Sequence, residues 1–315
     1  MDYYYDNYYG HSLTDLETLL ASYRRTWTGN SVIYLVGDSI LDNKYWVKGT
    51  KVPPPIIHVP HMKTAVPDVA YWVNHHLEGI GAPLMCLNCA VEETTLNEKL
   101  TGLSPQDIFV RDHLRTTDSL VISVGGNDIA LKPSYRTIAH MTSLLATPGS
   151  LLHKNPSFGY FVNYFVTGIR KYVEKLTKYV RPQHVIVVFP YFPSLTGTGW
   201  ADTALMLMGY GQWPGRLQLI MRSIYDAVTQ ELIGTTGTGL TVLPLYDIFD
   251  PRIEKDYVAR VEPSASGGKK IAAAIVRITC PPVPEGEVVT PPQGPKVDQK
   301  VDQKVDQKVD QKVNY

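Results

Sequence analysis

Apolar residues along the chain follow two alternating patterns. Five short runs are almost continuously apolar, as in strands buried on both faces: Val32–Val36, Leu84–Leu87, Leu120–Val124, Val185–Phe189 and Leu240–Leu243. Between them, helix-like patterns lie near residues 68–77, 106–114, 160–179, 217–232 and 268–278. This alternation predicts a three-layer α/β/α fold with a five-stranded parallel sheet, in the flavodoxin-like strand order 2-1-3-4-5.

The first strand run ends in a serine flanked by carboxylates. Gly37 gives a tight turn, and Asp38, Ser39 and Asp42 follow at the carboxyl edge of the sheet, where α/β proteins bind ligands. A hydroxyl on such a turn can face a pocket while its own N–H points at a substrate oxygen, so Ser39 is the candidate nucleophile. Asp38 is expected to accept local backbone N–H bonds, and the tripeptide alone equally suits an ordinary turn.

A second strand end carries a candidate oxyanion donor. Leu120–Val124 is followed by Gly125, Gly126, Asn127 and Asp128. The Asn127 side-chain amide can donate to a developing oxyanion, with Gly126 in support. The alternative is a simple turn made by the glycines and the Asn-Asp pair.

Together the two segments resemble the first and third blocks of the SGNH, or GDSL-type, esterase and lipase superfamily, and the resemblance covers residues 31–279. It implies the SGNH hydrolase form of the flavodoxin-like fold and a serine ester hydrolase that works through an acyl-enzyme. It also implies Ser39 as nucleophile and Asn127 as oxyanion donor, with no cofactor and no metal.

The second family block departs from the pattern at Glu93, which stands where a glycine N–H completes the oxyanion hole. A backbone donor survives this substitution if φ stays negative, but a carboxylate beside an oxyanion opposes catalysis unless it points away or is protonated. The alternative for Glu92 and Glu93 is the solvated first turn of a helix.

The fourth block departs further, because Glu262 stands at the position of the usual histidine base and Ala259 at that of its aspartate. Pro263 and Ser264 still suit the start of the last helix. The chain therefore resembles a divergent branch of the superfamily, with Glu in place of His.

Three mechanisms follow from this departure. In the first, Glu262 is the base, which requires burial to raise its pKa above the usual value of about 4.3. Alternatively, His58 or His61, from the proline-rich loop after the first strand, takes the role. In the third case the site is a catalytically inactive binding module for an acylated glycan or lipid.

Two long connections follow strands at this edge and carry aromatic side chains. Residues 44–67 include Tyr45 and Trp46, and residues 191–213 include Trp200. Such loops form lids or substrate walls, where aromatic rings contact sugars or acyl chains, or they pack as satellites of the core. The expected substrate is an acyl ester of a sugar or a lipid.

The two ends differ in composition from the domain at 31–279. Residues 1–30 hold a tyrosine-rich stretch at 1–10, expected to be a flexible leader, and then a first helix. Residues 280–295 form a proline-rich linker, and the Lys-Val-Asp-Gln repeats of 296–315 predict a disordered tail. The tail either docks an unknown protein or reflects expansion of a coding repeat.

Charge and apolar content limit the partners of the chain. Its 315 residues hold 30 acidic and 30 basic side chains, so there is no net field to attract nucleic acid or an anionic membrane. No apolar run reaches the roughly 20 residues of an integral membrane segment. Three cysteines and no signal peptide predict a reducing, cytoplasmic location.

Overall fold

The computed structural model describes residues 3–27, 30–58, 61–236 and 240–281. The predicted tail at 296–315, and the predicted linker beyond residue 281, lie outside the described residues. The described residues belong to one compact unit that extends to Pro281.

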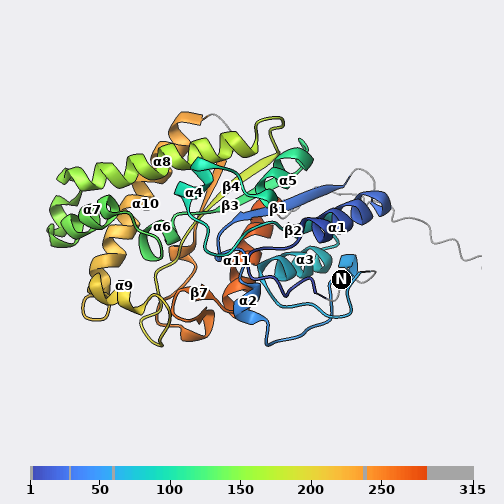
Figure 1. The fold of residues 1–315 in the computed structure, drawn as a ribbon, viewed down its shortest axis with the longest axis horizontal. Helices are drawn as coiled ribbons and strands as arrows, with labels where there is room; N and C mark the ends of the chain where they lie inside the picture. Colours follow the sequence, from blue (N-terminus) through green and yellow to red (C-terminus); the bar gives the residue numbers. More distant parts are fainter. Residues whose placement is uncertain (1–2, 28–29, 59–60, 237–239, 282–315) are drawn as a thin grey trace, which may run out of the picture. The chain divides into compact units, whose positions relative to one another are not determined.

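Five strands form a parallel sheet in the order β2-β1-β3-β4-β5 (Figure 1). They are β1 (Ser31–Gly37), β2 (Leu84–Asn88), β3 (Ser119–Ser123), β4 (His184–Phe189) and β5 (Leu240–Pro244). Every predicted strand run lies within one of these strands or extends one residue beyond it, and the predicted flavodoxin-like order is confirmed.

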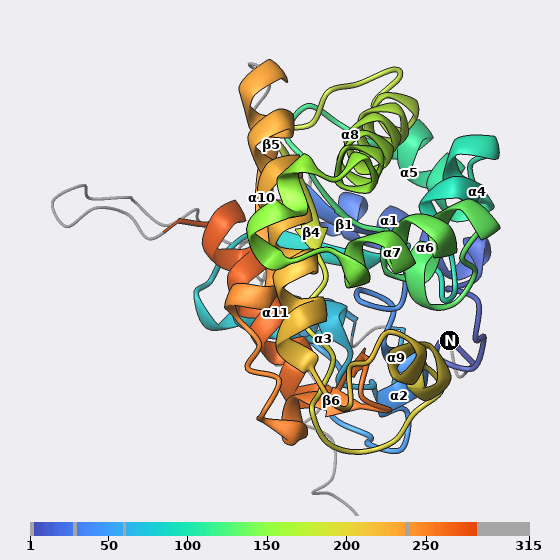
Figure 2. The same cartoon turned by 90° about the vertical axis from the view of Figure 1, so that its left-hand side faces the viewer.

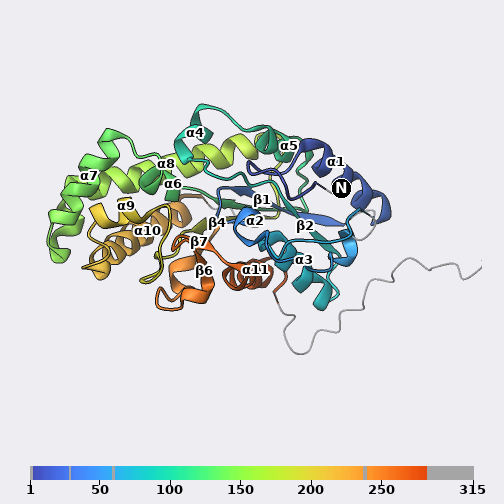
Figure 3. The ribbon, with the colours of Figure 1, turned by 60° about the horizontal axis from the view of Figure 1, so that its bottom comes forward.

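Helices cover both faces of the sheet, as predicted. The helices are α1 (Leu13–Thr26), α2 (Lys44–Val47), α3 (Val69–Gly79), α4 (Leu96–Thr101), α5 (Pro105–His113), α6 (Gly126–Ala130), α7 (Tyr135–Ala146), α8 (Pro156–Leu176), α9 (Asp202–Leu207), α10 (Pro214–Thr236) and α11 (Ala265–Thr279). Figure 3 shows α1, α5 and α8 on one side of the sheet and α3 and α11 on the other. On the first side, α7 and α8 pack against α10 (Figure 2).

The side chains of β1 alternate between two apolar cores. Val32, Tyr34 and Val36 pack under α1, α5, α8 and α10, while Ile33 and Leu35 pack under α3 and α11. Successive side chains of a strand point to opposite faces, so a strand between two helical layers must be apolar at every position. This is why the strand runs are continuous in the sequence.

Residues 3–10 do not form the expected flexible leader. Tyr4 is 4% exposed and belongs to the larger core. Its ring stacks on His11 at 3.8 Å between centroids, and its carbonyl oxygen lies 2.7 Å from His11 Nδ1. Aromatic side chains carry a large apolar area, and here their burial fixes the segment.

No helix in the described ranges combines the length and the apolar content needed to cross a membrane.

A hairpin of two short strands, β6 (Tyr257–Val258) and β7 (Glu262–Pro263), precedes α11. Ser264 begins that helix by accepting a hydrogen bond from Gly267 N–H, which agrees with the helix start predicted near Pro263. The hairpin therefore places Glu262 just before the N-terminus of a helix that Ser264 caps.

The end of β1 tolerates only glycine. Gly37 has φ of +120°, and an added Cβ would lie 1.8 Å from the carbonyl oxygen of Ser123. Since both the backbone angle and the space exclude a side chain, the two strands approach each other here more closely than an alanine allows.

We expect Gly37→Ala to lower the free energy of unfolding by about 3 kcal/mol or more, through a strained φ and a clash with backbone. Urea unfolding measures this change. Gly79→Ala is the matched control, since no atom lies within 4 Å of its added Cβ, and it changes stability by less than about 1 kcal/mol. Equal stability of the two variants would contradict the close approach of β1 to β3.

Candidate active site

Ser39 stands on a turn that Asp38 holds. Asp38 Oδ1 accepts hydrogen bonds from Ser123 Oγ at 2.7 Å and from the Ile40 N–H at 3.2 Å, as expected for an Asp that serves the local backbone. Burial raises the pKa of Asp38 to about 6, although both hydrogen bonds lower it. The turn leaves Ser39 at 7% exposure, at the junction of two cavities.

Asn127 lies beside Ser39, in the first turn of α6. Gly125 is the N-cap residue of this helix and has φ of +109°. Gly126 and Asn127 line the same cavity as Ser39. Asn127 Nδ2 donates to the carbonyl oxygen of Thr94 at 3.1 Å. An amide nitrogen carries two hydrogens, so this bond orients the group and leaves the second hydrogen for a ligand oxygen.

Glu262 reaches the site from the β6–β7 hairpin, whose turn is strained. Ala259 and Arg260 have φ of +48° and +68°, a left-handed conformation that costs roughly 1–2 kcal/mol per residue. Arg260 holds the turn in place through an ion pair with Asp202 at 2.9 Å and hydrogen bonds to the Ser194 carbonyl at 3.2 Å.

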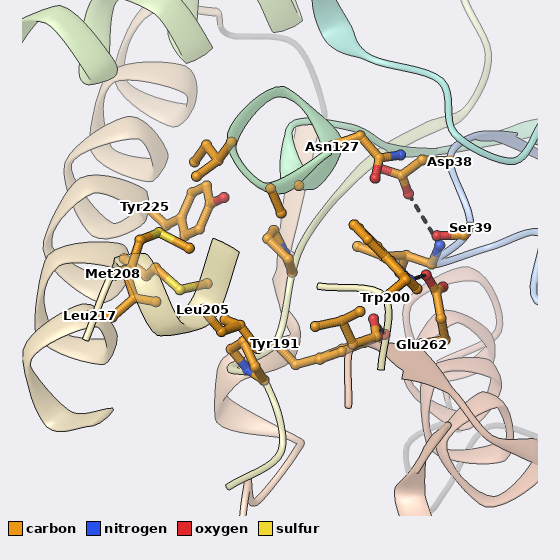
Figure 4. A pocket seen from close by; sticks show the side chains of 18 of the residues that line it. Asp38, Ser39, Asn127, Tyr191, Trp200, Leu205, Met208, Leu217, Tyr225 and Glu262 are labelled. Carbon is orange, nitrogen blue, oxygen red and sulfur yellow. Dashed lines mark hydrogen bonds between the residues drawn. The ribbon is translucent and has the colours of Figure 1, made fainter. Parts of the chain in front are cut away.

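The Glu262 carboxyl is buried against Ser39 (Figure 4). Burial raises its pKa to about 7, while interactions with the Ser39 hydroxyl and the Trp200 N–H lower it. Trp200 Nε1 donates to Oε1 at 2.9 Å. The second oxygen, Oε2, is buried and has no well-formed hydrogen bond within the described residues, so it can accept a proton.

The larger of the two cavities is an apolar chamber that ends at Ser39. It has about 760 Å³ of space not filled by protein atoms, open solvent included, against about 450 Å³ for the other cavity. Figure 4 shows Met208, Leu217 and Tyr225 at its far side from Ser39 and Glu262. Its other apolar lining residues include Ile129, Ala130, Met141, Tyr191, Leu205, Met221 and Val261.

The smaller cavity is lined by aromatic and carboxyl side chains. Four residues line both cavities: Ser39, Asn127, Trp200 and Glu262. The smaller one adds Tyr8, Trp46, Glu92, Glu93 and Leu131. Both predicted loops thus supply walls, since Trp46 comes from residues 44–67 and Trp200 from residues 191–213.

Glu92 is not part of a solvated helix start, as the alternative interpretation had it. It is 2% exposed, lies in a turn, and its Oε1 accepts a hydrogen bond from Trp46 Nε1 at 2.9 Å. Helix α4 begins later, at Leu96, with Thr95 as its cap. Burial first, and then the charge of Glu262, raise the pKa of Glu92 to about 10, so its carboxyl is neutral at pH 7.

Glu93 has φ of +59°, so the condition of a negative φ, which was set for a backbone donor here, is not met. A left-handed conformation favours glycine, the residue that the SGNH pattern has at this position. The Glu93 side chain accepts a hydrogen bond from the Tyr8 hydroxyl at 3.2 Å, and its carbonyl accepts one from Lys132 Nζ at 3.1 Å. Its N–H as an oxyanion donor stays a prediction.

His58 and His61 line neither cavity. Burial of the His58 ring, followed by the charge of His61, lowers the pKa of His58 to about 4. The structure therefore brings Ser39, Asn127 and Glu262 together but leaves the two loop histidines outside the site.

Two residues that line the smaller cavity were not predicted to do so from the sequence: Tyr8 and the buried Glu92. Tyr8 lies in a segment that has no apolar period, so no signal pointed to it. For Glu92, its position next to the expected glycine of the oxyanion hole was the available signal. The hydrogen bond from Trp200 to Glu262 was not predicted either, because the two residues are 62 positions apart in the sequence.

The raised pKa of Glu262 predicts how stability depends on pH. The ordinary pKa of a glutamate carboxyl is 4.5, and that of Glu262 in the folded protein is about 7. Between these two pH values the folded protein keeps a proton that the unfolded chain releases, so the free energy of unfolding falls as pH rises. We expect Glu262→Gln to be about 2–3 kcal/mol more stable than wild type at pH 8, and about equal to it at pH 4.

Urea unfolding at both pH values measures this difference. The exposed Glu17, replaced by Gln, is the matched control and changes stability by less than about 0.5 kcal/mol at either pH. A Glu262→Gln variant that is less stable than wild type at pH 8 would argue against an unfavourably buried charge.

Solved structures of lipases and esterases align with most of this chain at low sequence identity. One is a lipase from a goat rumen metagenome, with 15% identity, a TM-score of 0.48, and coverage of 79% of this chain and 97% of the lipase. Another is an acetylxylan esterase from Geobacillus stearothermophilus, with 14% identity, a TM-score of 0.47, and coverage of 81% and 96%.

A third is a member of the lipolytic G-D-S-L family from Veillonella parvula, with 13% identity, a TM-score of 0.42, and coverage of 78% and 97%. No protein-family model matches the chain, and no curated protein sequence does. The strand order of the sheet agrees with the flavodoxin-like order expected for this chain.

Proposed function

We propose that the protein is a serine ester hydrolase in which Ser39 is the nucleophile and Glu262 is the general base. One observation carries the proposal: the Glu262 carboxyl is buried beside Ser39, with a pKa of about 7 and an oxygen that can receive a proton. A base whose pKa lies near the working pH transfers protons most effectively, and an ordinary glutamate is too weak for this role.

In the first step, Ser39 Oγ attacks the ester carbonyl carbon as its proton passes to Glu262 Oε2. The carbonyl oxygen becomes an oxyanion, which the Ser39 N–H and the free amide hydrogen of Asn127 stabilise. Trp200 keeps Oε1 occupied, so the carboxyl presents Oε2 to the serine.

In the second step, the carbon–oxygen bond to the alcohol breaks and the protonated Glu262 gives its proton to the leaving alcohol. The acyl group remains on Ser39. Water then attacks this acyl-enzyme, Glu262 takes a proton from the water, and the acid is released as Ser39 recovers its proton.

The larger cavity supports an acyl group as the part of the substrate that it binds. Its walls are mostly apolar away from Ser39, with the Tyr225 ring among them, and methionine side chains such as Met208 and Met221 adapt to chains of different shape. The proposed substrate is therefore an acyl ester of a lipid or a sugar, with the acyl chain in this cavity.

We expect Ser39→Ala to abolish hydrolysis of p-nitrophenyl octanoate and labelling by a fluorophosphonate, because no nucleophile remains. Glu262→Gln lowers kcat/KM by about 10²–10⁴-fold, since an amide accepts no proton. His61→Gln and His58→Gln, as controls, change it less than about threefold.

Circular dichroism of each variant checks that it has folded. Turnover that survives Glu262→Gln but is lost in a histidine variant would move the base role to that histidine. A folded wild-type protein with neither labelling nor turnover would favour the binding module.

The hydrogen bond from Trp200 predicts a shift in the pH profile. Activity rises with pH as Glu262 loses its proton, and this bond lowers the pKa of Glu262. We expect Trp200→Phe to move the rising limb of kcat/KM upward by about half to one pH unit. Trp213→Phe, at a mostly exposed tryptophan, leaves the profile unchanged. A profile that moves downward in Trp200→Phe would contradict the assignment of this limb to Glu262.

A further inference from the structure

The two cavities meet at the reacting serine. Ser39, Asn127, Trp200 and Glu262 line both of them, so an ester bond placed at Ser39 has its acyl part on one side and its alcohol part on the other. The apolar chamber suits the acyl part. The smaller cavity is therefore where the alcohol part lies, beside the carboxyl that protonates it.

The smaller cavity has the chemistry to bind hydroxyl groups. Within the described residues, Glu92 Oε1 accepts from Trp46 and no hydrogen bond engages its second oxygen. Because burial and the charge of Glu262 keep the Glu92 carboxyl protonated, as its raised pKa indicates, it can both donate to a hydroxyl and accept from one. A simple alkyl alcohol offers no group to use this capacity.

The walls of the smaller cavity are aromatic. Tyr8, Trp46 and Trp200 line it, and flat rings with one polar atom suit ligands that have both C–H faces and hydroxyl edges. Tyr8 is held in place, since its carbonyl accepts from the buried Lys44 Nζ at 3.4 Å and this ammonium lies 2.7 Å from both oxygens of Asp42.

We infer that the smaller cavity binds the alcohol half of the ester and selects hydroxyl-rich alcohols such as sugars, with Glu92 as the specificity-determining residue and Tyr8 as an aromatic wall. This inference rests on the proposed function. A buried polar group that hydrogen-bonds a substrate hydroxyl rejects analogues that lack it, because it is then left unpaired.

The test compares two esters with the same acyl chain, 6-O-octanoylglucose and ethyl octanoate. We expect the wild-type protein to favour the glucose ester at least tenfold in kcat/KM. Glu92→Leu lowers kcat/KM at least tenfold for the glucose ester and less than threefold for ethyl octanoate. Glu92→Gln stays within threefold of wild type on both, because the amide is also neutral and can donate and accept.

Tyr8→Ala is a second variant that leaves the buried Glu92 intact. It lowers kcat/KM for the glucose ester at least fivefold, whereas Tyr9→Ala, at a neighbouring tyrosine that is 55% exposed and does not line the cavity, has no effect. Thermal melting of all variants shows that they are folded.

The outcomes separate the inference from the proposed function. If Ser39-dependent hydrolysis is seen but Glu92→Leu and Tyr8→Ala affect both esters equally, the inference is overturned and the proposed function stands. If neither ester is hydrolysed, the inference is tested by the binding of octyl β-glucoside below its critical micelle concentration. Tryptophan fluorescence measures this binding. Binding at least tenfold weaker in Glu92→Leu supports the inference, and unchanged binding overturns it.

Discussion

The close approach of β1 to β3 at their carboxyl ends is the constraint on which the site depends. Gly37 leaves no space for a side chain against Ser123, and Asp38 then bonds to the Ser123 hydroxyl. The turn after β1 and the turn after β3 are thereby locked to each other. Ser39 belongs to the first turn and Asn127 follows the second, so one backbone contact sets the relation between the proposed nucleophile and the proposed oxyanion donor.

The sequence predicted the sheet, Ser39 and Asn127 because all of them depend on local order, whereas Glu262 was named through the family resemblance. Strands buried on two faces are apolar at every position, and Ser39 and Asn127 directly follow such strands. The folding of residues 3–10 could not be predicted, since Tyr4 is buried by partners remote in the sequence. Nor could the bond from Trp200 to Glu262, which joins two segments with no shared pattern.

Backbone strain in the described chain is concentrated at the site. The non-glycine residues with positive φ are Glu93, Ala259 and Arg260, and each lies in a turn that presents a cavity residue. Such strain persists where surrounding contacts fix the backbone, as Arg260 does through Asp202 and Ser194. Together with the buried carboxyls of Asp38, Glu92 and Glu262, it indicates that this edge of the sheet is arranged for binding and not for stability.

If Glu262 is the base, as proposed, the presence of Ala259 where the SGNH pattern has an aspartate follows from the nature of that base. When an imidazole takes a proton from a serine, a cation and an anion appear together, and an aspartate stabilises the cation. When a carboxylate takes that proton, no new charge is created, because one negative charge migrates from Glu262 to the substrate oxygen. An aspartate beside Glu262 would stabilise nothing and would oppose its ionisation. Under the proposed function, the two departures from the SGNH pattern, Ala259 and Glu262, form a single change: proton transfer shifts an existing negative charge and creates no new pair of opposite charges.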